Sequence, residues 1–190
     1  MEEEAGQVQN EELDPQQEAR RRFALAQIRQ YPDPVLRMKA RKIEAVDDDV
    51  RRLVERMTGL MRDANGVGLA ATQVGILRRV FIFHPEEGVT AAVVNPQIAK
   101  RSDEAVVDDE GCLSLQGVHV PVERSLEVTI EGTDENGAPV SYALAELGAR
   151  VAQHELDHLD GVLILDRTTP EARREALATL RPRPVLGALG

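Results

Sequence analysis

Two histidines and a glutamate in one five-residue segment are the residues of this chain whose types and spacing could do chemistry. They lie in His154-Glu155-Leu156-Asp157-His158. In a helix, side chains four residues apart lie on one face, roughly 6 Å apart along the axis, so both imidazoles could reach one cation. Glu155 would lie about 100° around the helix from His154, where it could take a proton from a water on that cation. The pattern predicts a hydrolytic metal site; the alternative is two half-buried histidines that hydrogen-bond to protein groups.

A hydrolytic metal usually has three protein ligands and one open position, so a third ligand must come from elsewhere in the chain. No histidine follows the segment, and the downstream Glu171 and Glu175 fall on a predicted surface helix. We expect His84, which precedes Pro85 at the end of a strand, to lie in a loop. We expect His119 to be structural. None of these residues is a strong candidate for the third ligand.

Cys112 is a better candidate, and it is the only cysteine of the chain. It cannot form a disulfide within the chain, and it lies in the glycine-containing segment Glu-Gly-Cys-Leu-Ser at 110–114. A thiolate is a strong ligand for a borderline or soft divalent metal. The alternative is a small buried hydrophobic residue, which is what many free cysteines are. Combined with the two histidines, Cys112 is expected to complete the metal site.

Three segments together resemble the peptide deformylase family in its bacterial form. The first has the pattern G-apolar-G-apolar-A-A-x-Q and reads GVGLAATQ at 66–73. The second is EGCLS at 110–114, and the third is QHELDHLDG at 153–161. They occur in the family's order, and the resemblance runs from about residue 28 to residue 166. Gln116 departs from the pattern, because the family usually has proline there, which affects the rigidity of that loop rather than the ligands.

The resemblance implies metal-dependent hydrolysis of the formyl group from N-formylmethionine at the N-terminus of newly synthesised polypeptides. Cys112, His154 and His158 would hold the metal, and Glu155 would act as general base and acid. The resemblance favours Fe²⁺, with Zn²⁺, Ni²⁺ or Co²⁺ able to occupy the site, whereas ligand chemistry alone would favour Zn²⁺.

The same resemblance implies which groups would contact the substrate. The Gln73 side-chain amide and the Leu113 backbone N–H would stabilise the oxyanion. Main-chain groups of Val67, Gly68 and Gly111 would pair with the peptide. Val67, Leu147 and Val151 would line the pocket for the methionine side chain. Without the resemblance, the glycines could simply form a turn and the apolar residues could be ordinary core.

Glu110 and Arg124 match family positions that form an ion pair, which would brace the segment that carries the cysteine ligand.

The elements that must position these residues follow from hydrophobic periodicity and turn signals. Helices are predicted over residues 14 to about 30, 47–65, about 146–160 and 169 to about 180. Strands are predicted at 79–83, 91–94, 125–131 and 139–144, the last two joined at Asn136-Gly137, with a short strand or turn at 162–165. Antiparallel strands with segregated helices indicate an α+β domain. The resemblance adds antiparallel sheets packed around a central helix that carries HExxH, with a C-terminal helix.

The length of 190 residues suits one domain. We expect an acidic extension over 1–26, partly disordered or a short helix, a catalytic domain over 27–181, and a tail over 182–190. Apolar residues make up 42% of the chain, but aromatic residues only 3%, and tryptophan is absent. The core must therefore be mainly aliphatic.

Charge and hydropathy limit the partners and the location. The net charge is −10, but residues 1–18 contain seven acidic side chains and no basic one, so the remainder is near −3. This balance does not favour direct binding of duplex nucleic acid. No apolar run approaches the roughly 20 residues of a membrane span. The start of the chain has no signal-peptide or transit-peptide character, so we expect a cytoplasmic protein without membrane contact.

The expected partners are N-formylmethionyl nascent peptides. In some bacterial relatives the C-terminal helix docks on the ribosome, and residues 167–190 here contain five arginines against two glutamates. Ribosome docking through this helix is therefore a hypothesis.

Two other functions compete with deformylation. The first is an HExxH endopeptidase, which would need a different third ligand. The second is a non-catalytic binding module with a structural metal, which would need a closed sphere of four ligands.

Overall fold

The computed structural model describes residues 14–181, which form one α+β domain. The expectations for residues 1–13 and 182–190 lie outside the described residues. The helices are α1 (Pro15–Gln27), α2 (Asp48–Asp63), α3 (Glu146–Leu159), α4 (Ile164–Arg167) and α5 (Pro170–Leu180), with short 3₁₀ helices η1 (Pro34–Arg37) and η2 (Ala71–Val74). The strands are β1 (Gly68–Ala70), β2 (Val80–Glu86), β3 (Val89–Arg101), β4 (Ala105–Glu110), β5 (Val120–Ser125), β6 (Glu127–Thr133) and β7 (Pro139–Ala145).

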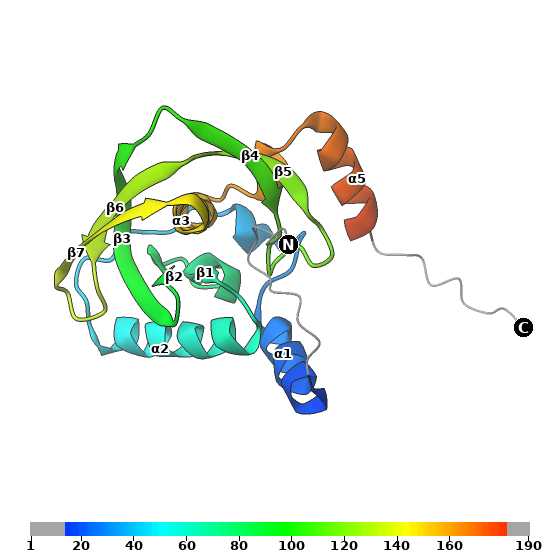
Figure 1. Ribbon diagram of the computed structural model, residues 1–190. Helices are drawn as coiled ribbons and strands as arrows, with labels where there is room; N and C mark the ends of the chain where they lie inside the picture. The colour runs from blue at the N-terminus through cyan, green and yellow to red at the C-terminus, as the bar shows by residue number, and fades with distance from the viewer. Residues whose placement is uncertain (1–13, 182–190) are drawn as a thin grey trace, which may run out of the picture.

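The strands form two antiparallel sheets around α3. One sheet has five strands in the order β1-β2-β3-β6-β7, and the other is the β4-β5 hairpin. Figure 1 shows α3 end-on at the centre, with β6 and β7 on one side of it, β1 and β2 below it and the β4-β5 hairpin at the upper right. The predicted fold class is therefore confirmed.

The alternation of apolar residues along β2 explains how one sheet separates two helices. Val80 and Ile82 belong to the core cluster of α2, whereas Phe81 and Phe83 belong to the cluster of α3. Successive strand residues point to opposite faces, so one apolar run can supply both cores. The phenylalanine rings contact each other edge-to-face, with centroids 5.5 Å apart. The two helices are therefore held at fixed positions on either side of β1 and β2.

The ends of α2 follow local signals in the sequence. The Asp47 side chain accepts a hydrogen bond from the Val50 N–H at 2.9 Å, which caps the first turn. At the other end, Asn65 adopts a φ of 57° and the Gly66 N–H donates to the Met61 carbonyl at 2.9 Å. Helix α2 therefore ends just before the glycine-containing segment 66–73, which includes β1 and most of η2.

The structure differs from the sequence expectations at several places. Residues 162–165 were expected to be a short strand or turn, but α4 begins at Ile164. The β4-β5 hairpin was not predicted, because β4 is largely exposed and carries three consecutive acids, 108–110. His84 was expected in a loop, but it lies within β2 at an irregularity in the pairing with β3.

No helix among residues 14–181 combines the length and apolar character that crossing a bilayer requires.

Candidate metal centre

The side chains of Cys112, His154 and His158 converge on one buried point. The Cys112 sulfur lies 3.3 Å from His158 Nε2, and His158 Nε2 lies 3.1 Å from His154 Nε2. All three ligand atoms lie within 4.8 Å of one another, and all three residues are buried. Helix α3 supplies the histidines from one face, and the segment after β4 brings the cysteine to them. The predicted convergence of one sulfur and two imidazoles is present.

These separations and donor types suit a single divalent cation. Sulfur and nitrogen atoms about 2.0–2.3 Å from one tetrahedral ion lie roughly 3.3–3.6 Å apart. Burial by itself disfavours an imidazolium, but hydrogen bonds to Cys112 and Glu110 outweigh it and raise the pKa of His154 to about 10. Burial and the charge of His154 hold the pKa of His158 well below its usual value. A cation would replace the proton shared in this cluster, as metal binding to such ligands requires.

Glu110, the last residue of β4, orients the centre through His154. Its Oε2 lies 3.0 Å from His154 Nδ1, which directs Nε2 of that ring toward Cys112 and His158. Both carboxylate oxygens also accept hydrogen bonds from Arg124, at 2.8 and 2.9 Å. Burial would raise the pKa of Glu110, but the hydrogen bonds from Arg124 and His154 hold it well below its usual range. Glu110 is therefore an ionised acceptor at neutral pH.

Arg150 also contacts Glu110, although the sequence analysis did not select it. Its Nη1 donates to Glu110 Oε1 at 2.8 Å and to the Val122 carbonyl at 2.9 Å, and its Nη2 donates to the Val106 carbonyl at 2.9 Å. Arg150 therefore ties α3 to both strands of the hairpin. One signal was available: Arg150 lies four residues before His154, so a charged residue occupies the helix face that carries the ligands.

Asp157 extends the same network away from the centre. It accepts hydrogen bonds from Arg124 Nη1 at 2.5 Å and from Arg167 Nη2 at 2.6 Å. Asp157 therefore continues a network of ion pairs that begins at Glu110 and ends at Arg167 on α4.

Glu155 lies on α3 against β1, and its side chain requires the glycine at position 68. The residue is fully buried. A Cβ placed on Gly68 would lie 2.3 Å from Glu155 Oε1 and 2.9 Å from Val151 Cγ1. The missing side chain of Gly68 therefore makes room for the Glu155 carboxylate, in addition to any close approach of a substrate.

Gln73 and Leu113 flank the cysteine ligand. The Gln73 side-chain oxygen accepts the Ala70 N–H at 2.9 Å, which leaves its amide nitrogen pointing to Ser114 Oγ at 3.2 Å and to Cys112 Sγ at 3.7 Å. Leu113 follows Cys112 directly and is buried. Two groups expected to stabilise an oxyanion are thus beside the sulfur.

The residues expected to bind substrate are only partly brought together. Val67 and Val151 are buried in one core cluster, whereas Leu147 lies on the first turn of α3, is 43% exposed and is outside that cluster. Gly111 lies beneath the ring of His119, because a Cβ there would be 2.9 Å from His119 Nε2. Gly68 borders Glu155, as described above.

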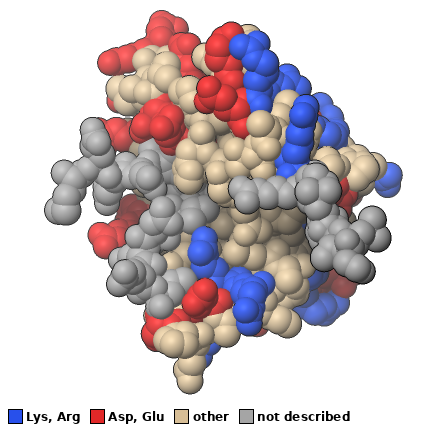
Figure 2. All heavy atoms as spheres, turned by 90° about the vertical axis from the view of Figure 1, so that its right-hand side faces the viewer, with Lys and Arg blue, Asp and Glu red and all other residues tan. Residues whose placement is uncertain are grey.

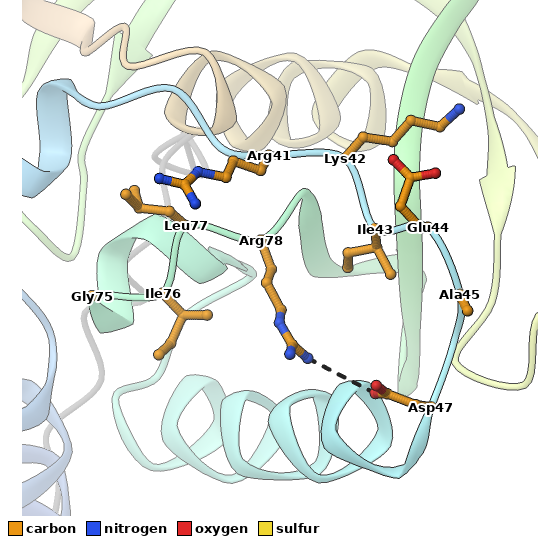
Figure 3. Close-up of a pocket in the computed structure, with 10 residues that line it drawn as sticks. All are labelled: Arg41, Lys42, Ile43, Glu44, Ala45, Asp47, Gly75, Ile76, Leu77 and Arg78. Carbon is orange, nitrogen blue, oxygen red and sulfur yellow. Dashed lines mark ion pairs between the residues drawn. The ribbon is translucent and has the colours of Figure 1, made fainter.

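A separate hollow of about 730 Å³ lies between residues 41–47 and 75–78 and contains none of these side chains. Figure 3 shows that Arg78 points across it to Asp47, at 3.8 Å, while Lys42 and Glu44 extend to its far side. Its lining therefore carries both positive and negative side chains.

Comparisons with known proteins agree with this centre. Residues 25–174 match the family model described as polypeptide deformylase. The chain is 40% identical over 153 residues to a peptide deformylase of Desulforudis audaxviator, which covers 80% of this chain and 99% of that protein.

Two solved structures show the same likeness. A peptide deformylase from Thermotoga maritima has a TM-score of 0.72 and 42% identity, covering 75% of this chain and 97% of its own. A peptide deformylase from Ehrlichia chaffeensis has a TM-score of 0.77 and 32% identity, covering 80% of this chain and 93% of its own.

The substitution Arg150→Met tests the bracing of the centre. We expect it to lower the free energy of unfolding by roughly 3 kcal/mol, because a buried ion pair loses one partner. We also expect metal retention to weaken about tenfold, because Glu110 loses part of its support. Urea unfolding and competition with a chelator would measure the two effects.

Arg150→Lys keeps the positive charge but lacks the forked guanidinium group. Its free energy of unfolding and its metal retention should therefore lie between those of the parent and of Arg150→Met. Met57→Ala, which leaves a cavity in the core cluster of α2 rather than in that of α3, provides a control of comparable instability. Unchanged metal retention in folded Arg150→Met would contradict the bracing role.

Proposed function

The chain belongs to the polypeptide deformylase family, and on this premise we propose that Cys112, His154 and His158 hold a metal ion at which Glu155 drives deformylation. The family removes the formyl group from N-formylmethionine on nascent peptides, so the chain is a metal-dependent hydrolase of that substrate. The observation that carries the assignment of residues is the convergence of one sulfur and two imidazole nitrogens within 4.8 Å. Family membership favours deformylation over the endopeptidase and the non-catalytic module.

When bound, the cation would supply Lewis acidity, which would lower the pKa of a water molecule and polarise the formyl carbonyl. Glu155 would accept the proton of the attacking water on its carboxylate and pass it to the leaving amine nitrogen. Its burial against Gly68 keeps bulk water from competing for that proton. General acid–base catalysis of this kind contributes about 10²–10⁴-fold.

Gln73 and Leu113 would stabilise the charge that develops on the formyl oxygen. Support comes from the orientation of the Gln73 amide, whose own oxygen is held by Ala70 and whose nitrogen faces the sulfur of Cys112. A donor fixed before the reaction does not have to reorganise during it, and one such donor is typically worth about 3 kcal/mol.

The peptide would lie along Val67, Gly68 and Gly111, with the methionine side chain near Val67, Leu147 and Val151. Val67 and Val151 already share one cluster, and the exposed position of Leu147 suits a residue at the mouth of such a pocket.

We further infer a cytoplasmic location. The substrate is a nascent peptide, and a lone cysteine that serves as a thiolate ligand suits a reducing compartment.

Glu155→Gln tests the general base. We expect the variant to bind metal at the parent level but to lose about 10²–10⁴-fold in kcat/KM on formyl-Met-Ala-Ser, because the amide cannot accept the proton. Metal analysis and release of formate would be measured together. Glu171→Gln, an exposed acid at the start of α5, should retain parent activity. Full turnover by Glu155→Gln would refute the assignment.

Fe²⁺ is the proposed native metal, on the basis of the family resemblance alone. We expect protein purified without oxygen to contain close to one iron per chain and to lose both iron and activity in air. Reloading with Ni²⁺ or Co²⁺ should restore activity. Stoichiometric zinc with full activity in the anaerobic preparation would contradict this proposal.

Ribosome docking through α5 is proposed from the exposed Arg173 and Arg174 on that helix. We expect the double substitution Arg173→Glu and Arg174→Glu to reduce co-sedimentation with ribosomes at low salt, because contacts to RNA phosphates depend on positive charge. The same charge reversal at the exposed Arg51 and Arg52 of α2 is the matched control. Equal binding by both double variants would argue against docking through α5.

A further inference from the structure

A second hollow, of about 240 Å³, opens beside the metal centre between α1 and the segment that follows Cys112. Arg21 and Leu25 line it from α1, and Cys112, Leu113 and His119 line it from the other side. None of its lining residues is acidic. The hollow therefore joins the segment that carries the sulfur ligand to a positively charged side chain of α1.

Helix α1 is fixed relative to the centre by packing and by hydrogen bonds at its end. Ala24 and Ile28 are buried in the core cluster of α2. Beyond the helix, the Arg29 N–H donates to the Gln73 carbonyl at 2.7 Å, and the Tyr31 N–H donates to the Ser114 carbonyl at 2.9 Å. Gln30 Nε2 donates to the Leu113 carbonyl at 2.9 Å. The two segments proposed to stabilise the oxyanion are therefore hydrogen-bonded to the chain directly after α1.

Arg21 faces the hollow and has no acidic partner among the described residues 14–181. It lies one turn before Leu25, so both side chains occupy one helix face. Its Nε is buried and has no hydrogen-bond partner among residues 14–181, and no ion pair involves it in that range. By contrast, the buried Arg124 and Arg150 are paired with carboxylates. A buried N–H without an acceptor costs about 1–3 kcal/mol, so a bound carboxylate would be favourable here.

Figure 2, which views the side of the molecule where α1 and α5 lie, shows uncharged areas near the middle of this face, with both acidic and basic side chains above and below them. Arg20 and Arg22 flank Arg21 in sequence, but both are exposed and do not line the hollow. Residue 21 also precedes residue 25, where the family match begins. Arg21 therefore lies outside the matched family region.

We propose that Arg21 is a specificity residue that binds a carboxylate side chain of the peptide substrate, downstream of its formylmethionine. The inference rests on the proposed function. A peptide that pairs with Gly111 would lie beside His119, which also lines the hollow, and its next side chains could enter the hollow, where Leu25 and Val118 could contact the methylene groups of a glutamate. The guanidinium fork matches a carboxylate with two parallel hydrogen bonds. Nascent peptides with an acidic residue shortly after methionine are then the preferred substrates.

The test compares charged and neutral residues of the same shape. We would measure kcat/KM for formyl-Met-Glu-Ala against formyl-Met-Gln-Ala, and for formyl-Met-Ala-Glu against formyl-Met-Ala-Gln. At one of the two positions the parent should prefer glutamate about 3- to 10-fold at low salt, and added salt should reduce the preference. Arg21→Gln should bring the ratio to about one, and Arg21→Lys should retain part of it. Arg22→Gln is the matched control and should keep the parent ratio.

A glutamate-to-glutamine ratio near one at both positions in the parent, or a preference that survives Arg21→Gln, would overturn the proposal. Equilibrium binding of the same peptides to Glu155→Gln protein, with and without Arg21→Gln, requires no turnover. If the chain removed no formyl group, the proposed function would fail, but the binding ratio would still decide the role of Arg21.

Discussion

An ionised carboxylate, buried between two arginines and a histidine, holds together the parts of this molecule that carry its chemistry. Glu110 accepts hydrogen bonds from Arg124 on β5 and from Arg150 on α3, and it meets His154 Nδ1 at 3.0 Å. A buried carboxylate is costly unless its oxygens are fully paired, and here both are. The same four groups join the hairpin to the central helix and fix the tautomer of one ligand. Stability of the hairpin and geometry of the centre therefore depend on one interaction.

The position of α3 explains why a chain with few aromatic residues can build such a centre. The helix is covered by the five-stranded sheet and by the hairpin (Figure 1), and its two histidines are buried. Water is excluded by backbone and aliphatic groups, which strengthens the electrostatic interactions among the ligands. Gly68 shows how closely the elements approach, because no side chain fits between β1 and Glu155.

Helix α1 adds an element that the matched family region, residues 25–174, does not include in full. The chain directly after it is hydrogen-bonded, through the Arg29 and Tyr31 N–H groups, to the carbonyls of Gln73 and Ser114, on both segments beside the cysteine. The position of α1 is therefore coupled, through these hydrogen bonds, to the segments that surround the sulfur of Cys112. This arrangement allows an N-terminal helix to modify substrate choice while the ligands and the central helix stay unchanged.

The sequence by itself determined the α+β class, α2, α3, α5, the β6-β7 hairpin and the three ligand candidates, because each depends on local periodicity, caps or spacing. The family resemblance, rather than any local pattern, singled out Glu110 with Arg124. Only the tertiary structure decided the β4-β5 hairpin, whose exposed acidic strand lacks an apolar alternation, and the roles of Arg150 and Gly68. The roles of Arg150 and Gly68 depend on contacts between residues far apart in the sequence, as in the pair of Arg150 with Glu110, which are 40 positions apart. Local patterns contain no information about such distances, since only the packed fold brings those side chains together.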